Sequence, residues 1–557
     1  MIPRYPTVRP STALQKTAGL FYFTIQNYYV FMMTIKDLPP ALVSDLTQQQ
    51  VNIERTLRVL ELIGKEADAG QRPAASLTLP SADDPRISDM TGNPSALLPI
   101  KDVKERLEDL QLSLRPEEAG ISDGDRIRFD YRALRNLGIR LYPRLAVGVL
   151  NGGMATSYTD IKKNRALNPE AFTSLQAEFE RLASDDKGKP KGICGAYIGR
   201  EGEEGASFML LKMRSLLINA LEYRILTGDR KSPVLPFFQM TSTGTDAPLK
   251  EAYERYRENP LISGLIQKTG IDPTKAEGRV QDFLAALTHS SQGFPRRIFS
   301  NACGRENKGL ALPGGHGENF RVLAPVYREL RSRGIRFVYL GNVDNLGYTV
   351  DPAALGLFAL RGGELAFEFS WKTAVDIKGG VLTENSAGIL NAADIGQAIG
   401  ADQIKAQEDA GGRVLFNCAT GIFDLDYLTD NIDTIKDEIP IRLSDQDKEA
   451  GRYAQAEQTT WEILSLVKNP LIFAVAKEKR FIAAKMLMET LMASPVSEKI
   501  DQDSSVPGEI KDMSRRLREG LGTLLERELG FSSPDSRGKR AALSADELEK
   551  RIRSVYE

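Results

Sequence analysis

Short apolar runs that end in glycine-rich or polar turns recur through the middle of this 557-residue chain. Residues 144–150 (RLAVGVL) run into 151–153 (NGG), and residues 335–340 (IRFVYL) are followed by 342–345 (NVDN). Continuous rather than alternating apolar character is typical of strands that are buried on both faces, as in parallel sheets. We therefore predict a buried strand at each of these places. Further strands are predicted at residues 234–240, 365–369 and 414–416.

A helical pattern precedes the second of these runs. Phe320, Leu323, Tyr327 and Leu330 recur at the spacing of one helix face, and Gly334 ends the pattern. Loop, helix, strand and loop in this order make half of a βαβ repeat. The sequence thus predicts an α/β fold with a mostly parallel sheet. Its ligands are expected at the loops that follow the carboxyl ends of the strands.

The two ends of the chain have a different character. Apolar residues at helical spacing in 51–63 and 510–524 predict helical N-terminal and C-terminal regions. Residues 19–33 are apolar but too short for the roughly 20 residues of a membrane span. We interpret 1–32 as an extension upstream of a start at Met33. A signal peptide is the alternative, although no small-residue cleavage site follows.

Composition excludes several classes of function. The 73 basic and 75 acidic residues give a net charge of −2, so no bulk attraction to nucleic acid or to an anionic membrane is expected. The three cysteines show no CxxC spacing, which favours reduced thiols in a cytoplasmic protein. With two histidines in the chain, a histidine-rich metal site is excluded. A metal here relies on oxygen ligands, as Mg²⁺ does.

Three stretches are candidates for binding chemistry. Glycines in 151–153 allow the backbone to approach a base or phosphate closely, although such a turn alone is weak evidence. Residues 313–318 (PGGHGE) begin a helix, where backbone N–H groups suit an anionic ligand, and a tight turn is the alternative. Asp344 follows a buried strand and can hold Mg²⁺ beside a phosphate. An Asx turn without a ligand explains Asp344 equally well.

Together these stretches resemble the UDP-glucose pyrophosphorylase family, the UTP–glucose-1-phosphate uridylyltransferases. Leu150–Thr156 (LNGGMAT) is similar to the family's LNGGLGT, Pro313–Glu318 to PPGHGD, and Asn342–Asp351 (NVDNLGYTVD) to NIDNLGATVD. Lys372–Gly380 (KTAVDIKGG) is similar to KTxADVKGG, and Arg480–Lys485 (RFIAAK) to an FLPVK-type segment. The resemblance implies a Rossmann-like mixed, mostly parallel sheet of the nucleotide-diphospho-sugar transferase type, with helical N-terminal and C-terminal regions.

The chain departs from the family pattern at several positions. The family's phosphate-loop lysine stands in a GPK context, and Lys163 is the nearest counterpart that we assign here. Gln292 is one residue short of the family's QxxxP spacing, and the family's EIAQ becomes DIGQ from Asp394. FNTNN becomes FNCAT from Phe416, which removes one asparagine. The family's C-terminal left-handed β-helix is not evident. These departures weaken any prediction about the sugar.

The resemblance implies a role for each matching residue. Asp344 would hold Mg²⁺, while Lys485 and Lys163 would neutralise phosphate charge as catalytic residues. Without the resemblance, Lys485 reads as a lysine that extends to solvent from a packed helix. The nucleotide would be bound by Leu150, Asn151, Gly152, Gly153, Gln292 and Gly315. The sugar phosphate would be bound by His316, Asn342, Lys378, Asp394 and Asn417.

The resemblance also predicts the segments of the chain. These are an extension (1–32), a helical N-terminal region (33–140), a catalytic nucleotidyltransferase domain (141–440), a helical segment returning a lysine to the site (441–497) and a charged helical tail (498–557).

The implied reaction joins UTP and glucose 1-phosphate to give UDP-glucose and pyrophosphate, with Mg²⁺ as cofactor. UTP and the sugar 1-phosphate are the expected partners, and neither nucleic acid nor a membrane is expected. Relatives that use N-acetylhexosamine 1-phosphate resemble PGGNGG, so His316 favours glucose. Three alternatives stay open: an N-acetylhexosamine enzyme, a broad-specificity UDP-sugar pyrophosphorylase, and a non-catalytic UDP-sugar-binding regulator. The regulator is expected to lack the cationic and metal residues, and this chain has both Asp344 and Lys485.

Overall fold

The computed structural model describes residues 34–68, 77–373, 376, 379–396 and 398–556. The predicted extension 1–32 and Lys378 therefore lie outside the described residues. The chain divides into a smaller and a larger unit. The smaller unit comprises residues 1–73, 284–311 and 445–454, and the larger unit comprises residues 74–283, 312–444 and 455–557.

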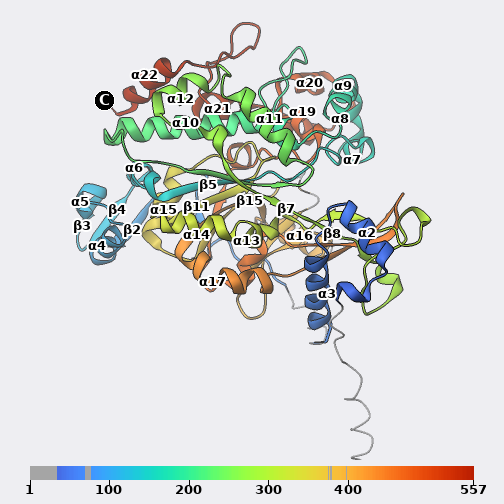
Figure 1. Cartoon of the computed structure of the whole chain (residues 1–557). Coiled ribbons are helices and arrows are strands. Elements are labelled where there is room, and N and C mark those ends of the chain that lie inside the picture. Colours follow the sequence, from blue (N-terminus) through green and yellow to red (C-terminus); the bar gives the residue numbers. More distant parts are fainter. Residues whose placement is uncertain (1–33, 69–76, 374–375, 377–378, 397, 557) are drawn as a thin grey trace, which may run out of the picture. The chain divides into compact units, whose positions relative to one another are not determined.

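A ten-stranded mixed sheet forms the centre of the larger unit (Figure 1). Neighbouring strands along its main path are parallel, except that β15 is antiparallel to both of its neighbours. This confirms the predicted mixed, mostly parallel sheet. Along the path the strands are β1 (Ile87–Asp89), β18 (Leu471–Val475), β12 (Leu365–Trp371), β15 (Leu415–Asp424), β11 (Phe337–Asn342), β5 (Leu145–Leu150), β6 (Phe237–Ser242) and β7 (Glu277–Gln281), and β13 (Gly380–Glu384) and β14 (Leu390–Asp394) form a hairpin beside β15.

Successive residues of the central strands face opposite sides of the sheet and enter two separate apolar clusters. Val147 and Tyr339 belong to one cluster, whereas Ala146 and Val338 belong to the other. The side chains alternate in this way because successive residues of a strand point to opposite faces of the sheet. Both sides are covered by helices, which explains the continuous apolar runs in the sequence. One side carries α6 (Tyr131–Arg140), α10 (Phe208–Thr227), α15 (Pro352–Arg361), α19 (Leu487–Ala493) and α21 (Gly508–Arg527), and the other carries α13 (Asn319–Val322), α14 (Ala324–Ser332) and α17 (Leu425–Glu438).

Helix α10 is apolar around its whole circumference and almost entirely buried. Two of its cationic residues, Lys212 and Arg214, are buried. Lys212 donates to the carbonyls of Asn345 and Tyr348, at 2.8 and 3.2 Å. Arg214 donates to the carbonyls of Leu529, Gly530, Leu543 and Leu261 without a carboxylate partner, and burial lowers its pKa to about 10. None of the helices in the described part of the chain is long and apolar enough to cross a membrane.

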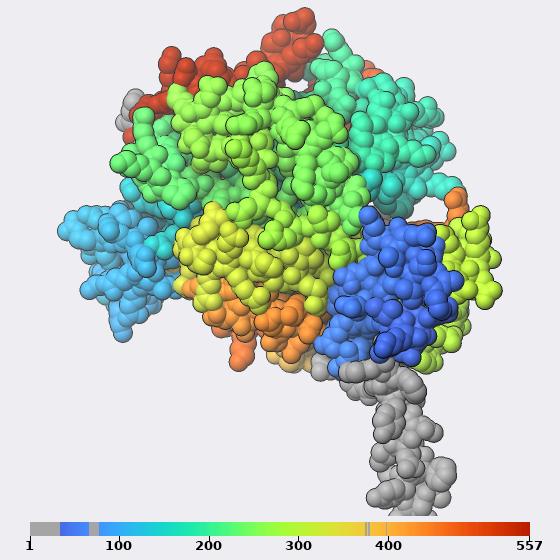
Figure 2. All heavy atoms as spheres, viewed as in Figure 1, coloured from blue at the N-terminus to red at the C-terminus, as the bar shows by residue number. Residues whose placement is uncertain are grey.

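The region 33–140 is less helical than predicted. It contains β1, and a small sheet in which β4 (Arg126–Phe129) pairs with both β2 (Ala96–Pro99) and β3 (Ile121–Asp123). In β4 exposed arginines alternate with the fully buried Ile127 and Phe129, a strand pattern too short to stand out in the sequence. In Figure 2 the residues around 100–130, in light blue, protrude from the surface of the larger unit.

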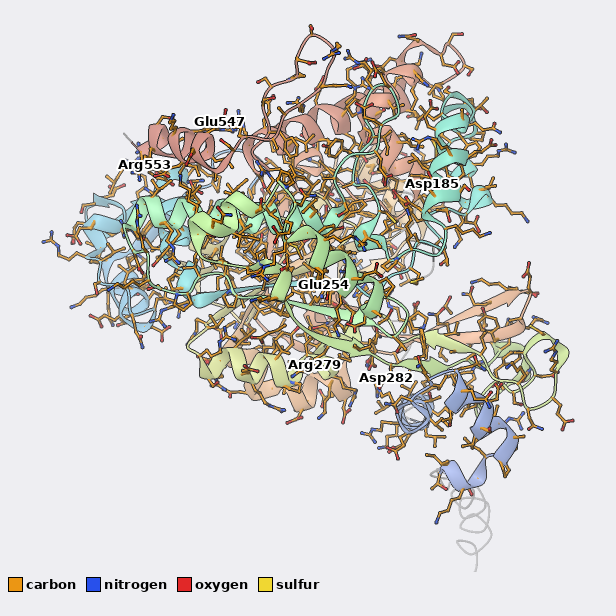
Figure 3. The ribbon with its side chains drawn as sticks, turned by 45° about the horizontal axis from the view of Figure 1, so that its top comes forward. Asp185, Glu254, Arg279, Asp282, Glu547 and Arg553 are labelled. Atoms are coloured by element: carbon orange, nitrogen blue, oxygen red, sulfur yellow. The ribbon has the colours of Figure 1, made fainter. Side chains whose placement is uncertain are left out.

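The C-terminal prediction is confirmed in outline. Helices α20 (Glu498–Gln502), α21 and α22 (Ala545–Tyr556) make up most of the tail, and Ser544 and Glu547 cap α22 by mutual hydrogen bonds. The segment 441–497, which we predicted to be helical, contains strands at Arg442–Lys448, Gly451–Glu457 and Leu471–Val475, and its residues 481–486 are not helical either. Outward faces of the helices are charged, as Asp185 and Glu254 show on α9 and α11 (Figure 3). Further helices of the larger unit are α4 (Ile100–Asp109), α5 (Pro116–Ala119), α7 (Ile161–Arg165), α8 (Pro169–Ser174), α9 (Gln176–Asp186), α11 (Asp246–Tyr256), α12 (Ser263–Thr269), α16 (Ala401–Asp409) and α18 (Lys477–Arg480).

The smaller unit contains α2 (Pro40–Gln48) and α3 (Ile53–Asp68) packed on the 284–311 segment. Asp45 accepts from the Gly309 amide at 2.8 Å and pairs with Lys308 at 2.5 Å. Thr56 accepts from the Ala285 amide at 3.0 Å. Segments distant in sequence are thereby joined within this unit. The remaining strands of the chain are β8 (Phe283–Ala285), β9 (Leu287–Thr288), β10 (Ala311–Pro313), β16 (Arg442–Lys448) and β17 (Gly451–Glu457).

Candidate active site

The carboxyl ends of the parallel strands meet at one edge of the large sheet. Asn342 at the end of β11 pairs with Leu150 at the end of β5, and Leu150 pairs with Met240 of β6. Because β15 is antiparallel, its first residues lie at the same edge, and Phe416 pairs with Ser370 at the end of β12. Ligand crevices of open α/β sheets form at such an edge. The fold therefore brings Leu150, Asn342 and Asn417 to the same edge of the sheet.

The glycine turn after β5 is held by a buried asparagine. The Asn151 amide N–H donates to the Met240 carbonyl at 2.7 Å, and its side-chain amide donates to Gln239 and Tyr253 at 3.2 and 3.1 Å. A Cβ added to Gly153 would meet nothing within 4 Å, so this glycine faces open space. Gly152 accepts from the Ser242 hydroxyl at 2.8 Å. Hydrogen bonds of Asn151 and Gly152 thus hold the turn in place, and Gly153 leaves space for a ligand.

The segment 480–485 docks directly on the Asp344 loop. The Ala484 amide donates to the Asp344 carbonyl at 2.9 Å, and Asn345 donates its side-chain amide to the Arg480 carbonyl at 2.9 Å. Lys485 follows Ala484, so the structure brings Lys485 and Asp344 together, and Lys485 is exposed. The docking uses backbone hydrogen bonds, which explains why this stretch is extended and not helical. Within the described chain the Asp344 carboxylate has no hydrogen bond or ion pair.

A lysine that we did not predict lies at this site. The Lys191 amide donates to the Gly153 carbonyl at 3.0 Å, and its ammonium donates to the Ala484 carbonyl. The ammonium lies 3.1 Å from the centre of the Tyr158 ring. Burial lowers the pKa of Lys191 to about 8, against the opposing effect of the nearby Asp344 charge. Lys191 thus joins the glycine turn to the Asp344 loop.

Lys163, which we assigned as the phosphate-loop lysine, lies on the surface of the larger unit. It is exposed on α7, where its ammonium donates to the Ser157 hydroxyl at 2.9 Å. The stretch Gly188-Lys189-Pro190-Lys191 is a better counterpart of the GPK context. Helices α7 to α9 stand between it and the glycine turn in sequence. The hydrogen bonds of Lys191 to Gly153 and Ala484 favour Lys191 over Lys163 as the phosphate-loop lysine.

The glycine-histidine stretch packs against the turn η8 (Thr460–Leu466). Gly315 has φ of +85°, and a Cβ there would lie 2.4 Å from the Gln458 carbonyl oxygen, so only glycine fits. The Thr460 amide donates to His316 Nδ1 at 3.0 Å, and the imidazole lies 4.5 Å from the Trp461 ring. Burial, with the positive Lys485 and Arg442, lowers the pKa of His316 to about 3. A neutral His316 with Nδ1 as acceptor carries its proton on Nε2.

Two of the predicted sugar contacts, Asp394 and Asn417, already bond to other groups of the protein, whereas the side-chain oxygen of Asn342 is buried without a partner in the described chain. Asp394 forms an ion pair with Arg442, which also pairs with Glu462. Asn417 is buried and accepts from the Ala419 amide at 2.8 Å. Beside them, Lys477 and Asp376 form a buried ion pair of 2.5 Å. Arg442 and Lys477 are charged residues near the predicted site that sequence reasoning missed.

Two predicted residues cannot be placed at this edge. Gln292 belongs to the smaller unit, where it is exposed at the end of the short turn η5 (Ser290–Gln292). Lys378 lies outside the described residues. Their assignments stay predictions.

The donor set at this edge suits a metal that is shared with phosphate. Among the residues that the structure describes, no group of three or more His, Cys, Asp or Glu side chains is placed to hold a metal. Mg²⁺ in phosphate chemistry is typically bound through one or two carboxylates plus substrate phosphates. The unpaired carboxylate of Asp344 fits this requirement, so a metal here depends on a bound nucleotide.

The fold of this chain is similar to those of two solved structures. It matches the crystal structure of UDP-N-acetylglucosamine pyrophosphorylase from Trypanosoma brucei in complex with an inhibitor, with a TM-score of 0.57 at 16% identity over 87% of this chain and 80% of that chain. It also matches UDP-glucose phosphorylase from Trypanosoma brucei, with a TM-score of 0.50 at 14% identity over 81% of this chain and 77% of that chain. At these identities the matches show the fold alone.

Sequence comparison finds a family model over part of the chain. Residues 297–513 match the family model of UTP–glucose-1-phosphate uridylyltransferase. Two curated relatives of that name are from Encephalitozoon cuniculi, 36% identical over 93 residues, and Solanum tuberosum, 33% identical over 102 residues. The matches cover 16% and 17% of this chain and 18% and 21% of the relatives, so they span about a fifth of the relatives' length.

Proposed function

We propose that this chain transfers the uridylyl group of UTP to glucose 1-phosphate, giving UDP-glucose and pyrophosphate. The observation that carries the proposal is that hydrogen bonds through Ala484 link Lys191 and the Asp344 loop, and that Lys485 directly follows Ala484. The Lys191 amide bonds to the Gly153 carbonyl and its ammonium to Ala484, while the Ala484 amide bonds to Asp344. Two lysines and one unpaired carboxylate beside an open glycine turn form a suitable binding site for a nucleoside triphosphate with Mg²⁺.

In the proposed reaction an oxygen of the sugar phosphate attacks the α-phosphorus of UTP. The bond from that phosphorus to the pyrophosphate oxygen breaks, and pyrophosphate leaves with the electron pair. No covalent intermediate with the protein is required. The residues of the chain therefore act by positioning the two phosphates and by neutralising their charge.

Each residue at the edge has a part in this proposal. Gly152 and Gly153 offer backbone to the uracil ring, because no side chain keeps the base away. Lys191 and Lys485 neutralise negative charge on the triphosphate and on the departing pyrophosphate. Asp344 holds Mg²⁺, which when bound stabilises the charge that develops on the phosphate oxygens.

The sugar preference rests on His316. Its Nδ1 accepts from Thr460, so its Nε2–H is free to donate to a sugar phosphate, and the low pKa keeps the ring neutral. A histidine here resembles the glucose enzymes, whereas the N-acetylhexosamine enzymes resemble PGGNGG. Arg442 holds Asp394 near the predicted sugar site, which leaves one Asp394 oxygen for a sugar hydroxyl.

The decisive experiment is pyrophosphate release by the purified chain with Mg²⁺, a panel of nucleoside triphosphates and a panel of sugar 1-phosphates. UTP with glucose 1-phosphate is expected to give the highest kcat/KM. A sugar that turns over at least about tenfold faster, a difference of about 1.4 kcal/mol, would make glucose the wrong substrate. Release with no pair, while UDP-glucose still binds, would favour a non-catalytic regulator.

A matched variant separates sugar choice from catalysis. His316→Asn is expected to reduce kcat/KM for glucose 1-phosphate more than for N-acetylglucosamine 1-phosphate. An equal loss for both sugars would show that His316 orients the phosphate and does not select the sugar.

A further inference from the structure

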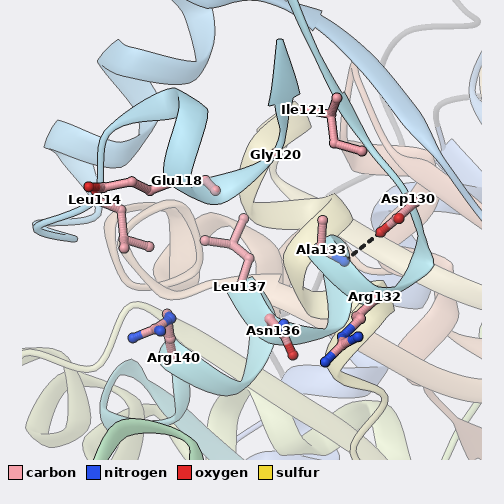
Figure 4. Close-up of a pocket in the computed structure, with 11 residues that line it drawn as sticks. Leu114, Glu118, Gly120, Ile121, Asp130, Arg132, Ala133, Asn136, Leu137 and Arg140 are labelled. Carbon is pink, nitrogen blue, oxygen red and sulfur yellow. Dashed lines mark hydrogen bonds between the residues drawn. The ribbon is translucent and has the colours of Figure 1, made fainter. Parts of the chain in front are cut away.

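A cavity lies in the larger unit, on α6 and the small sheet that precedes it (Figure 4). Its volume is about 260 Å³. Helix α6 lines it with Arg132, Asn136 and Arg140, and the segment around α5 and β3 lines it from the other side. Pockets for drug-sized ligands span about 300–1,000 Å³, so this one suits a smaller molecule.

The polar lining of α6 follows the helical repeat. Arg132, Asn136 and Arg140 are each four residues apart, so they lie along one face of the helix. Eight residues of helix span about 12 Å, which sets the distance between the two arginine Cα atoms. The side chains of Arg132, Asn136 and Arg140 have no hydrogen bond or ion pair with the rest of the described chain.

Carboxylates of the cavity are already satisfied, in contrast to the arginines. Asp130 caps α6 by accepting from the Ala133 amide at 2.8 Å, a bond drawn in Figure 4. Glu118 accepts from the Arg115 amide at 2.9 Å and from its guanidinium at 2.8 Å. Both carboxylates therefore have hydrogen-bond donors within the protein, whereas the two guanidinium groups have no acceptor in the described chain and can bond to a ligand. Leu114, Ala133 and Leu137 give the same cavity an apolar wall.

We infer that this cavity binds a small organic molecule with an anionic group at each end, such as a bisphosphate. Guanidinium groups recognise phosphate and carboxylate by paired, charge-assisted hydrogen bonds. Arg132 and Arg140 each take one anionic end, Asn136 bonds to the middle, and the apolar wall packs on the body of the ligand. This site is separate from the sheet edge that holds Asp344, and the inference does not depend on the proposed reaction.

The test is calorimetric titration of the full chain with a linear six-carbon diol that carries a phosphate at both ends. The monophosphate of the same diol is the control ligand. The bisphosphate is expected to bind at least about tenfold more tightly than the monophosphate, and Arg132→Gln and Arg140→Gln are each expected to weaken it at least about tenfold. Arg128→Gln is the matched control, because it removes the same charge from the neighbouring β4 outside the cavity.

The outcome also identifies where the ligand binds. Lys485→Ala is expected to leave the affinity within about twofold, because Lys485 lies at the other site. No binding, or binding that both arginine variants leave unchanged, would overturn the inference. Binding that Lys485→Ala abolishes would also overturn it, by placing the ligand at the sheet edge. Both arginines lack partners, so the thermal midpoint of each variant is expected to match the parent and to show that folding is intact.

Discussion

Two clusters of buried or half-buried charge lie near each other in the larger unit, and they differ in whether the charges are paired. In the first cluster, Arg480 forms a 2.7 Å ion pair with Glu368, and Tyr339 and Thr349 complete their hydrogen bonds. In the second cluster, Lys191 donates to a backbone carbonyl and the Asp344 carboxylate has no partner within the described chain. The same segment, 480–485, contributes to both clusters.

The difference separates charges that hold the fold from charges that await a ligand. A buried charge is tolerated when its partner comes with the chain, and removal of one partner then leaves the other unpaired. A charge without a partner is unfavourable for folding and is kept where it serves binding or catalysis. Variants in the first cluster should therefore affect stability, and variants in the second should affect turnover.

The largest effect is expected from the paired cluster. Glu368→Ala leaves the buried guanidinium of Arg480 without its carboxylate and should lower the free energy of unfolding by about 3–5 kcal/mol. Denaturant unfolding of the purified protein measures it. Glu384→Ala, which breaks the more exposed pair with Arg86, is the control and should cost at most about 1 kcal/mol. Equal losses in the two variants would remove the contrast between the clusters.

Asp344→Asn should show the opposite behaviour. Turnover with UTP and glucose 1-phosphate should fall by about two orders of magnitude, because the substitution removes the negative charge that binds Mg²⁺. The free energy of unfolding should change by at most about 0.5 kcal/mol, since no partner in the described chain loses its bond. Steady-state kinetics at saturating Mg²⁺ measure the turnover, and denaturant unfolding measures the free energy of unfolding. Near-normal turnover would identify Asp344 as a turn residue.

The choice between the two candidate phosphate lysines is expected to show clearly in kcat. Lys191→Met should lower kcat by about a hundredfold, in the range seen when a single charge-stabilising donor is removed. Lys163→Met should stay within about threefold, because its exposed ammonium bonds only to Ser157 among the described residues. Lys485→Ala is expected to resemble Lys191→Met. A larger loss of kcat in Lys163→Met than in Lys191→Met would instead support Lys163 as the phosphate-loop lysine, as we predicted from the sequence.

The smallest effect is expected in the pH dependence. Burial lowers the pKa of Lys191 from its ordinary value of 10.5 to about 8, so the folded protein loses this proton before the unfolded chain does. Between about pH 8 and 10.5 the unfolded chain binds more protons, so the contribution of Lys191 to stability rises with pH. Over the same range kcat/KM should fall as the ammonium loses its charge. Lys191→Arg should remove the falling limb, and a limb that persists in this variant belongs to another group.

The sequence predicted the parts of the fold that have a strong local pattern. β5 and β11 were predictable because a strand buried on both faces leaves no polar interruption. β3 and β4 were missed because all three residues of β3 are exposed, and because four alternating residues in β4 resemble ordinary surface sequence. The extended form of 481–486 was missed because it follows from hydrogen bonds to the Asp344 loop, about 140 positions away. Contacts between segments so far apart in the sequence do not change the spacing of apolar residues within either segment, so they cannot be predicted from it.

The candidate site was predictable to the extent that its residues follow strands or match a motif. Asp344 and Gly153 satisfy both conditions. Lys485 satisfied only the second, and the structure brings it to Asp344. Lys191 satisfied neither, because α7 to α9 separate it from the glycine turn. Its proximity is a product of tertiary folding, which returns the chain to the turn after α9.

The buried guanidinium of Arg214 has a consequence for the order in which the larger unit assembles during synthesis. Its carbonyl acceptors at Leu529, Gly530 and Leu543 are made 315 to 329 residues later. A guanidinium cannot enter an apolar interior without acceptors, so in the nascent chain this side chain stays in water. Helix α10 therefore cannot complete its burial while the first strands of the sheet are emerging. The ribosome must deliver residues 529–543 before the unit can close.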